Sequence, residues 1–119
     1  MTLTKADLSH FTGSDHYYRH WAMRLVYTDG VKYVADDGDA YWLLDAISSY
    51  QTRTFLKDPM LEEFQCWKLT VNANDTATLV CERDTNDVVV TQEIAYTDFP
   101  LSEIKFYLVE GVLMLPSEY

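Results

Sequence analysis

Apolar and polar residues alternate along the second half of the chain in the manner of β-strands. The segments 64–71, 76–83 and 88–97 are rich in Val, Thr and aromatic residues, and clusters of Asn and Asp separate them. Because such clusters supply turns, the three segments are expected to form an antiparallel meander. After a corner at 98–103, two further apolar runs meet at Glu110-Gly111 and predict a final hairpin.

In the middle of the chain the apolar positions have a helical spacing instead. One face of the segment 40–50 is apolar, and Asp45, Ser48 and Ser49 face away from it. This periodicity predicts the main helix, and Asp39 is a natural N-cap for it. The apolar face consists of Ala40, Leu43, Leu44, Ile47 and Tyr50.

Just before this helix, Asp29-Gly30 stands between two β-rich runs. The dipeptide tolerates the positive φ angles of a two-residue turn. It therefore predicts a hairpin in which Leu25 lies opposite Val34. Both faces of this hairpin are largely apolar, so its strands are expected inside a sheet and not at its rim.

Shorter elements are predicted near the start and in the middle of the chain. Thr4 or Thr2 is expected to cap a short N-terminal helix, and the aromatic segment 14–22 is expected to be extended, with a helical turn as the alternative. Asp58-Pro59 predicts a further short helix, because Asp favours the N-cap position and Pro the first helical position.

The two cysteines are expected on neighbouring strands. An even-length turn around residues 72–75 gives a register that places Cys66 opposite Cys81. Two cysteines are too few for a disulfide framework, so a reduced pair is expected, with a bridge between them as the alternative.

Together these elements predict one domain over residues 1–119 with an α+β fold. The fold is expected to be an antiparallel sheet of six to seven strands, built from hairpins and a meander, with one main helix and one or two short helices packed on a face. The chain has no apolar run that would span a bilayer, and its first residues are too polar for a secretory signal, so a cytoplasmic location is expected.

Charge narrows the range of partners. The chain carries 9 Lys and Arg against 19 Asp and Glu, a net charge of −10, and residues 36–119 alone carry five basic and sixteen acidic groups, a net of −11. Such a surface repels nucleic-acid phosphates and anionic membranes, since binding to either needs clustered Lys and Arg. It attracts basic protein surfaces. The candidate partner-binding residues are Asp36, Asp37, Asp39, Asp45, Glu62 and Glu63.

Only the N-terminal histidines offer metal-ligand chemistry. If residues 14–22 were helical, His16 and His20 would share a face at the spacing that zinc helices use, with His10 and Asp15 as further candidate ligands. Because no third ligand follows from the spacing, histidines that hydrogen-bond to the backbone are the simpler expectation. No glycine-rich phosphate loop or nucleophile motif occurs either, so no cofactor is predicted.

Several sequence blocks carry a family resemblance. They are A-D-L-x-x-F-T-G at 6–13, Y-R-H at 18–20, Y-T-D-G-V-K-Y at 27–33, A-Y-W-L-L-D-A-I at 40–47, F-Q-C-W-K-L at 64–69, Y-T-D-F-P-L at 96–101 and L-P-S-E-Y at 115–119. With these blocks the chain resembles a family of small uncharacterised bacterial proteins, classed as a domain of unknown function and frequent on plasmids, phages and integrated elements. The resemblance implies a setting in the mobile genome and supplies no reaction, cofactor or catalytic residue.

Charge and setting together favour a non-enzymatic binding module. We expect an inhibitor of the anti-CRISPR kind, which blocks the nucleic-acid-binding surface of a host defence protein or ribonucleoprotein complex. One alternative is a small metal-dependent hydrolase or nuclease that uses His10, His16 and His20 with Asp15. Another is a homo-oligomeric module, such as a homodimer, that associates through the exposed edge of the terminal hairpin.

Overall fold

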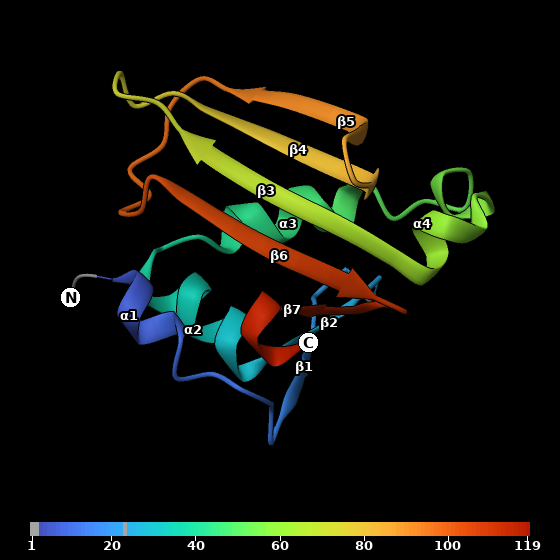
Figure 1. Cartoon of the computed structure of the whole chain (residues 1–119), viewed down its shortest axis with the longest axis horizontal. Helices are drawn as coiled ribbons and strands as arrows, with labels where there is room; N and C mark the ends of the chain where they lie inside the picture. Colours follow the sequence, from blue (N-terminus) through green and yellow to red (C-terminus); the bar gives the residue numbers. More distant parts are fainter. Residues whose placement is uncertain (1–2, 23) are drawn as a thin grey trace.

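The computed structural model describes residues 3–22 and 24–119. Within them the chain forms a seven-stranded sheet in the order β1-β2-β7-β6-β3-β4-β5 (Figure 1). The strands are β1 (Tyr17–Arg19), β2 (Val26–Thr28), β3 (Phe64–Val71), β4 (Ala77–Asp84), β5 (Asp87–Ile94), β6 (Glu103–Val109) and β7 (Val112–Met114). The helices are α1 (Lys5–Leu8), α2 (Asp29–Asp37), α3 (Tyr41–Ser49) and α4 (Pro59–Glu63), with the 3-10 turns η1 (Phe55–Lys57) and η2 (Pro116–Glu118). The predicted α+β class is confirmed.

One face of the sheet is covered by helices and the other is open. Helix α3 lies behind β3 and β6 in Figure 1, and its residues Leu43, Leu44 and Ile47 are at most 1% exposed. From the sheet, Trp67 and Phe106 are buried against them, each 1% exposed. The predicted main helix is therefore confirmed. Within the described residues, none of the helices has the length and apolar character that a membrane span requires.

The predicted hairpin at Asp29-Gly30 is wrong, because a helix begins there. Strand β2 ends at Thr28, whose hydroxyl accepts a hydrogen bond from the Val31 N–H at 3.4 Å and caps α2. Val31, Val34 and Ala35 are fully buried, at the i, i+3, i+4 spacing of a helix. An acidic residue is also favoured in the first turn of a helix, so Asp29 fits this role as well as it fits a turn.

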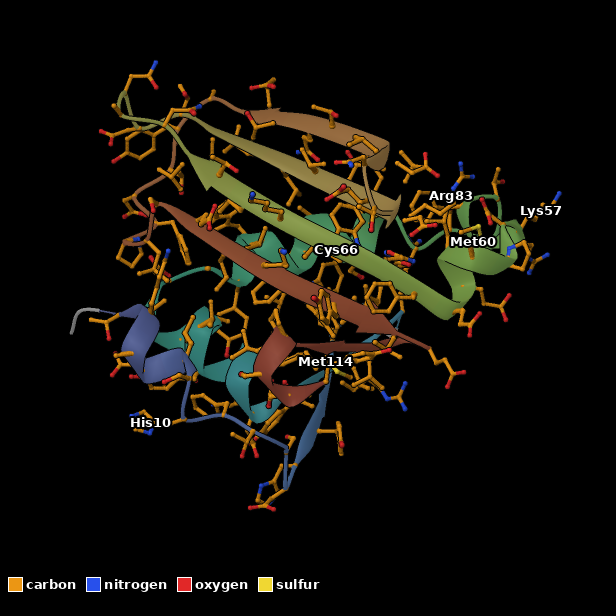
Figure 2. All side chains as sticks on the ribbon, viewed as in Figure 1. His10, Lys57, Met60, Cys66, Arg83 and Met114 are labelled. Carbon is orange, nitrogen blue, oxygen red and sulfur yellow. The ribbon has the colours of Figure 1, made fainter. Side chains whose placement is uncertain are left out.

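The meander and the final hairpin are confirmed, but the register of the first hairpin differs by one residue. Cys66 lies opposite Glu82 and not opposite Cys81. Asp75 adopts a left-handed φ of 64° within a connection, 72–76, of odd length, whereas the predicted register requires an even one. A shift of one residue moves side chains to the other face of a sheet. The two cysteines therefore lie on opposite faces, with Cys81 buried and Cys66 on the open face (Figure 2).

Strand β7 joins the two ends of the chain within the sheet. It pairs with β6 in an antiparallel hairpin and with β2 in a parallel arrangement, in which Val26 lies opposite Val112. The sheet is therefore mixed, with one parallel pair. Because β2 pairs with the outer edge of β7, that edge is not available to a second copy, and the homo-oligomeric alternative stays a prediction.

Both short helices begin as predicted. In α1, the Asp7 N–H donates to Thr4 Oγ1 at 3.2 Å, and the Thr4 N–H donates back to the Asp7 carboxylate at 3.1 Å. Thr2, the alternative cap, lies outside the described residues. In α4, Asp58-Pro59 occupies the predicted positions, and the Asp58 carboxylate accepts from the Met60 N–H at 2.9 Å.

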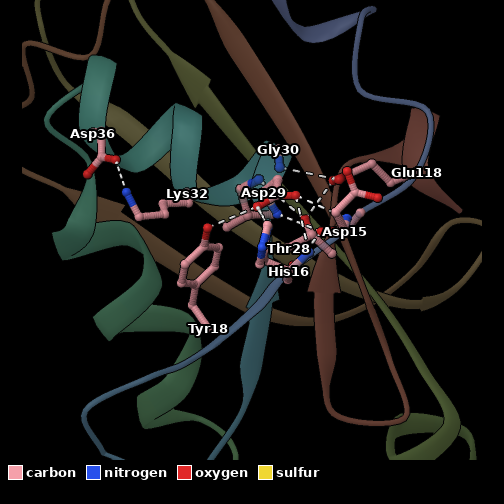
Figure 3. Close-up of polar contacts among 11 residues, drawn as sticks. Asp15, His16, Tyr18, Thr28, Asp29, Gly30, Lys32, Asp36 and Glu118 are labelled. Carbon is pink, nitrogen blue, oxygen red and sulfur yellow. Dashed lines mark hydrogen bonds and ion pairs between the residues drawn. The ribbon is translucent and has the colours of Figure 1, made fainter.

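Hydrogen bonds to the Glu118 carboxylate hold the C-terminal residues against the start of α2 (Figure 3). Its carboxylate accepts hydrogen bonds from Thr28 Oγ1 at 2.6 Å, the Gly30 N–H at 3.3 Å and the Leu115 N–H at 3.0 Å. The free N–H groups at a helix N-terminus favour a negative charge at this place. Gly30 leaves room for it, since a Cβ there would lie 2.5 Å from Glu118 Oε1.

Asp29 holds the segment that leads into β1 (Figure 3). Its carboxylate accepts from the N–H groups of Asp15 at 3.1 Å and His16 at 3.3 Å, and from the Tyr18 hydroxyl at 3.0 Å. Burial alone would raise the pKa of Asp29, but these hydrogen bonds outweigh it and hold that pKa below its usual value. The charged form of Asp29 therefore stabilises the fold.

Candidate functional site

Five of the six carboxylates predicted to form a docking surface fall into two groups. One group surrounds the turn between α2 and α3, and the other lies on α4, beyond the opposite end of α3 (Figure 1). The first group is Asp36, Asp37 and Asp39, the second is Glu62 and Glu63, and Asp45 belongs to neither because it lies on α3 and contacts His20. The two groups are therefore separate candidate sites.

A hollow of about 320 Å³ opens beside the α2–α3 turn. Two carboxylates, Asp39 and Asp98, line it together with Tyr41 and Tyr96, which are 40% and 69% exposed. Within the described part of the chain, no Lys or Arg lines it. We call it the turn hollow, and its lining is Asp39, Tyr41, Trp42, Tyr96, Thr97 and Asp98.

Phe99 brings the connection between β5 and β6 to this turn. Its ring is 5% exposed, and Phe99 Cε1 would lie only 2.9 Å from a Cβ at Gly38. The Thr97 N–H donates to the Asp75 carbonyl at 2.8 Å, and the Phe99 N–H donates to Thr97 Oγ1 at 3.1 Å. A buried ring and two hydrogen bonds thus fix the position of Asp98.

Asp39 lies at an unfavourable backbone position. Its φ is 49°, in the left-handed region, which costs a non-glycine residue about 1 kcal/mol. The prediction that it caps α3 is wrong, because Ala40 holds the N-cap position and no side chain caps the helix there. The Ala40 N–H instead donates to the Ala35 carbonyl at 2.9 Å, which closes the turn and leaves Asp39 exposed.

The carboxylates near the turn differ in how far they are neutralised. Lys32 Nζ lies 2.7 Å from Asp36 Oδ2 (Figure 3), and this hydrogen bond, followed by one from the Tyr41 hydroxyl, lowers the pKa of Asp36. Burial and the bond to Asp36 raise the pKa of Tyr41, so its hydroxyl stays protonated. Among the described residues, neither Asp39 nor Asp98 has an ion-pair partner. Their charge is available to a binding partner.

Asp45 faces the end of β1 and not the turn hollow. Its Oδ1 atom is hydrogen-bonded to His20 Nε2 at 2.7 Å and to Trp21 Nε1 at 2.8 Å. His20 is 4% exposed, and its Nδ1 accepts from the Ala22 N–H at 3.1 Å, so the proton of the neutral ring lies on Nε2. The ring of Trp21 nevertheless remains 77% exposed.

Ser48 lines the same hollow, of about 360 Å³, as His20 and Asp45. Its hydroxyl is buried and has no hydrogen-bond partner within the described residues. In a serine–histidine–carboxylate triad, the second ring nitrogen of the histidine must accept the serine proton. Because Nδ1 of His20 already accepts from the Ala22 N–H, the geometry does not support a nucleophilic Ser48.

The three histidines of the metal-dependent alternative lie apart. His10 follows α1, His16 precedes β1 and His20 follows β1. A shared face for His16 and His20 requires a helix over 14–22, whereas the structure has strand β1 at Tyr17–Arg19, so the expected extended form is confirmed there and the helical alternative is wrong. Across residues 3–22 and 24–119, no group of three or more His, Cys, Asp or Glu side chains is arranged to hold a metal ion.

The second acidic group borders a larger hollow, of about 570 Å³, between α4 and the β6–β7 turn. Glu62, Glu63 and Glu110 line it, and so does Arg24, whose guanidinium offsets part of their charge. No aromatic side chain of the described residues lines this hollow. It therefore lacks the large exposed rings that accompany the carboxylates of the turn hollow.

Sequence reasoning missed Asp98 and Tyr96. The segment 98–103 was predicted only as a corner between strands, and that much is confirmed, because it joins β5 to β6. The available signal was the order Y-T-D-F-P at 96–100, in which an apolar Phe follows Asp directly in a polar corner. A buried Phe at such a corner fixes the polar residues on either side of it.

Comparison with known protein families places the chain in one family. Residues 2–119 match a family model described as a family of unknown function (DUF6876). The chain belongs to this family. No curated protein and no solved structure matches this DUF6876 chain. The predicted membership of a family of unknown function is confirmed over nearly the whole chain, and the functional conclusion rests on the geometry of the site.

Proposed function

We propose that this protein is a non-enzymatic binding module that docks its turn hollow on a basic surface of another macromolecule. The turn hollow itself carries the proposal. It presents Asp39 and Asp98, without ion-pair partners among the described residues, between the exposed rings of Tyr41 and Tyr96.

Each of these groups has a physical role in binding. Tyrosine is enriched at interface hot spots, because its ring buries a large apolar area and its hydroxyl forms a hydrogen bond. The carboxylates provide ion pairs to Lys or Arg of the partner and reject acidic partners. The net charge of −11 over residues 36–119 adds a long-range attraction that accelerates association with a basic surface.

The partner that fits this chemistry is a nucleic-acid-binding protein or ribonucleoprotein complex. Its basic groove holds phosphates, and carboxylates can occupy the same positions. The resemblance to proteins of plasmids, phages and integrated elements favours a host defence complex in the cytoplasm as the target. The protein then acts as an inhibitor of the anti-CRISPR kind, because it occupies the groove that the nucleic acid needs.

Charge reversal in the turn hollow tests the proposal. DNA binding by a panel of purified CRISPR effector complexes is measured by gel shift, with and without the protein. We expect the wild type to reduce DNA binding by at least one complex, and the inhibition to weaken as salt rises, because screening removes the long-range attraction. The Asp39→Lys/Asp98→Lys variant is expected to lose inhibition by roughly tenfold or more, since two attractive pairs become repulsive.

A matched control distinguishes the effect of charges in the turn hollow from the effect of the net charge of the protein. Asp15→Lys/Asp84→Lys changes the net charge by the same amount at two exposed positions outside the turn hollow, and it is expected to inhibit like the wild type. Equal loss in both double variants would mean that bulk charge alone acts. Glu62→Lys/Glu63→Lys reports on the second acidic group, and loss in that variant alone would move the docking surface to α4. Inhibition of no complex in the panel would contradict the anti-CRISPR assignment.

A further inference from the structure

A hollow of about 300 Å³ beside β6 gathers three of the five lysines of the chain. It is separate from the turn hollow and shares no lining residue with it. Much of its wall is apolar. We call it the lysine hollow, and the lining residues that matter here are Lys5, Lys68, Lys105, Leu8, Ile104 and Leu115.

The sheet register brings two of these lysines together. Lys68 on β3 lies directly opposite Lys105 on β6, on the open face of the sheet. Like charges directly opposite each other on neighbouring strands destabilise a sheet. One carboxylate, Glu103, reaches Lys68 at 3.5 Å, while Lys105 and Lys5 form no ion pair within the described residues. The chain as a whole is acidic, with 19 Asp and Glu, whereas the charge around this hollow is positive.

The hollow exists because β7 is short. It pairs only with Tyr107–Val109, so from Glu103 to Phe106 strand β6 is paired with β3 on one edge and, within the described residues, with no strand on the other. Helix α1 and the C-terminal turn η2 lie along this side of β6 instead (Figure 1), and Ser117 Oγ donates to the Leu8 carbonyl at 3.4 Å. The gap between these elements and the strand is lined by apolar side chains of each.

We propose that the lysine hollow binds a free medium-chain carboxylate, such as octanoate. Leu8 and Pro116 take the hydrocarbon chain over a floor formed by the buried Ile104 and Leu115, and the ammonium groups of Lys68 and Lys105 take the carboxylate. Lysine suits this role, since it acts as a compact positive charge with several donors. The bound anion also relieves the repulsion between the two opposed ammonium groups.

The size and surroundings of the hollow select a small, free ligand. At about 300 Å³ it lies at the lower end of the range for ligand pockets. A phosphate backbone or an anionic bilayer presents many charges at once, and the net charge of −10 repels both. A single carboxylate on an apolar chain gains the local attraction without that penalty.

The test compares three ligands of equal chain length on the full-length protein. Octanoate, octanol and octylammonium are titrated by calorimetry and by ¹H–¹⁵N NMR. We expect saturable binding of octanoate, with amide shifts at Leu8, Ile104 and Leu115, weaker binding of octanol, and no binding of octylammonium. Equal binding of octanoate and octanol would overturn the role of the lysines, and amide shifts confined to other parts of the chain would overturn the site.

Matched variants assign the effect to single lysines. Lys105→Glu is expected to weaken octanoate binding by roughly tenfold, because an attractive charge becomes a repulsive one close to the carboxylate. Lys5→Glu is the second variant, because Lys5 also lines the hollow, its ammonium group adds to the local positive charge, and it lies in α1, outside the sheet. Lys57→Glu, an equal charge change at an exposed position in η1, is expected to bind like the wild type. Unchanged binding in Lys105→Glu and Lys5→Glu, or cosedimentation of the wild type with phosphatidylglycerol vesicles, would overturn the proposal. Neither result would bear on the turn hollow.

Discussion

Replacing Gly30 by alanine tests how tightly the C-terminal residues are held against α2. The new Cβ would lie 2.5 Å from Glu118 Oε1 and 2.7 Å from Leu115 Cδ1, and Leu115 is only 2% exposed, so it has little room to move. Overpacking of this kind costs about 1–3 kcal/mol. Alanine returns up to about 1 kcal/mol, since it is the better helix former. We therefore expect Gly30→Ala to lower the free energy of unfolding by roughly 1–2 kcal/mol.

The assay is urea unfolding followed by tryptophan fluorescence, to which the buried Trp67 contributes together with Trp21 and Trp42. Gly13→Ala is the matched control, because no atom lies within 4 Å of a Cβ at that position, and its stability is expected to stay within about 0.5 kcal/mol of the wild type. Adding Glu118→Ala removes one side of the clash, so the combined cost should fall short of the sum of the single costs by about 1 kcal/mol. A Gly30→Ala protein as stable as the wild type, or strictly additive effects of the two substitutions, would refute the close contact between α2 and the C-terminal turn.

Three further predictions concern acid stability, thiol reactivity and the start of α4. The pKa of Asp29 is lowered in the folded state, so its contribution to stability is present above about pH 4 and is lost as pH falls through the lower folded value. Asp29→Asn should therefore flatten the dependence of unfolding free energy on pH below that point, and an unchanged acid-unfolding profile would contradict this. Burial raises the pKa of Cys81 to about 12 and also raises that of Cys66. At pH 8 iodoacetamide should modify Cys66 slowly and Cys81 only after unfolding, as read by mass spectrometry; equal native-state rates would refute this. Asp58 caps α4 and lies 2.7 Å from Arg83, so Asp58→Ala should cost about 1–2 kcal/mol in a thermal or urea melt, whereas a cost below 0.5 kcal/mol would show that the cap is not needed.

The parts of the fold that sequence could predict are those with local signals. The meander from β3 to β5 follows from alternating residues and polar turns, and α3 follows from its apolar spacing. The register of the β3–β4 hairpin could not be predicted, because it depends on whether Asp75 adopts a left-handed φ and adds one residue to the turn. The parallel pairing of β2 with β7 had no local signal at all, since each strand has three residues and they lie far apart in the sequence.

The residues of the candidate site also divide into those with a local sequence signal and those without one. Asp39 could be predicted because an acidic run before a helix is visible in the sequence, although its role as an N-cap was wrong. Asp98 could not, because its position depends on Phe99 being buried close to Gly38, a contact between distant segments. Asp-Gly at 29–30 was misread because the dipeptide suits both a hairpin turn and a first helical turn. The buried spacing of Val31, Val34 and Ala35 decides between them only once the burial is known.

The place of β7 in the sheet has a consequence for biosynthesis. Of the seven described strands, the one that joins β1 and β2 to the rest of the sheet comes last in the sequence, so during synthesis β1 and β2 can pair only with each other while the meander can already form. A nascent chain that has not yet reached residue 112 exposes the apolar edge of its N-terminal half, which is the kind of species that chaperones bind. Closure of the sheet thus waits for the synthesis of β7.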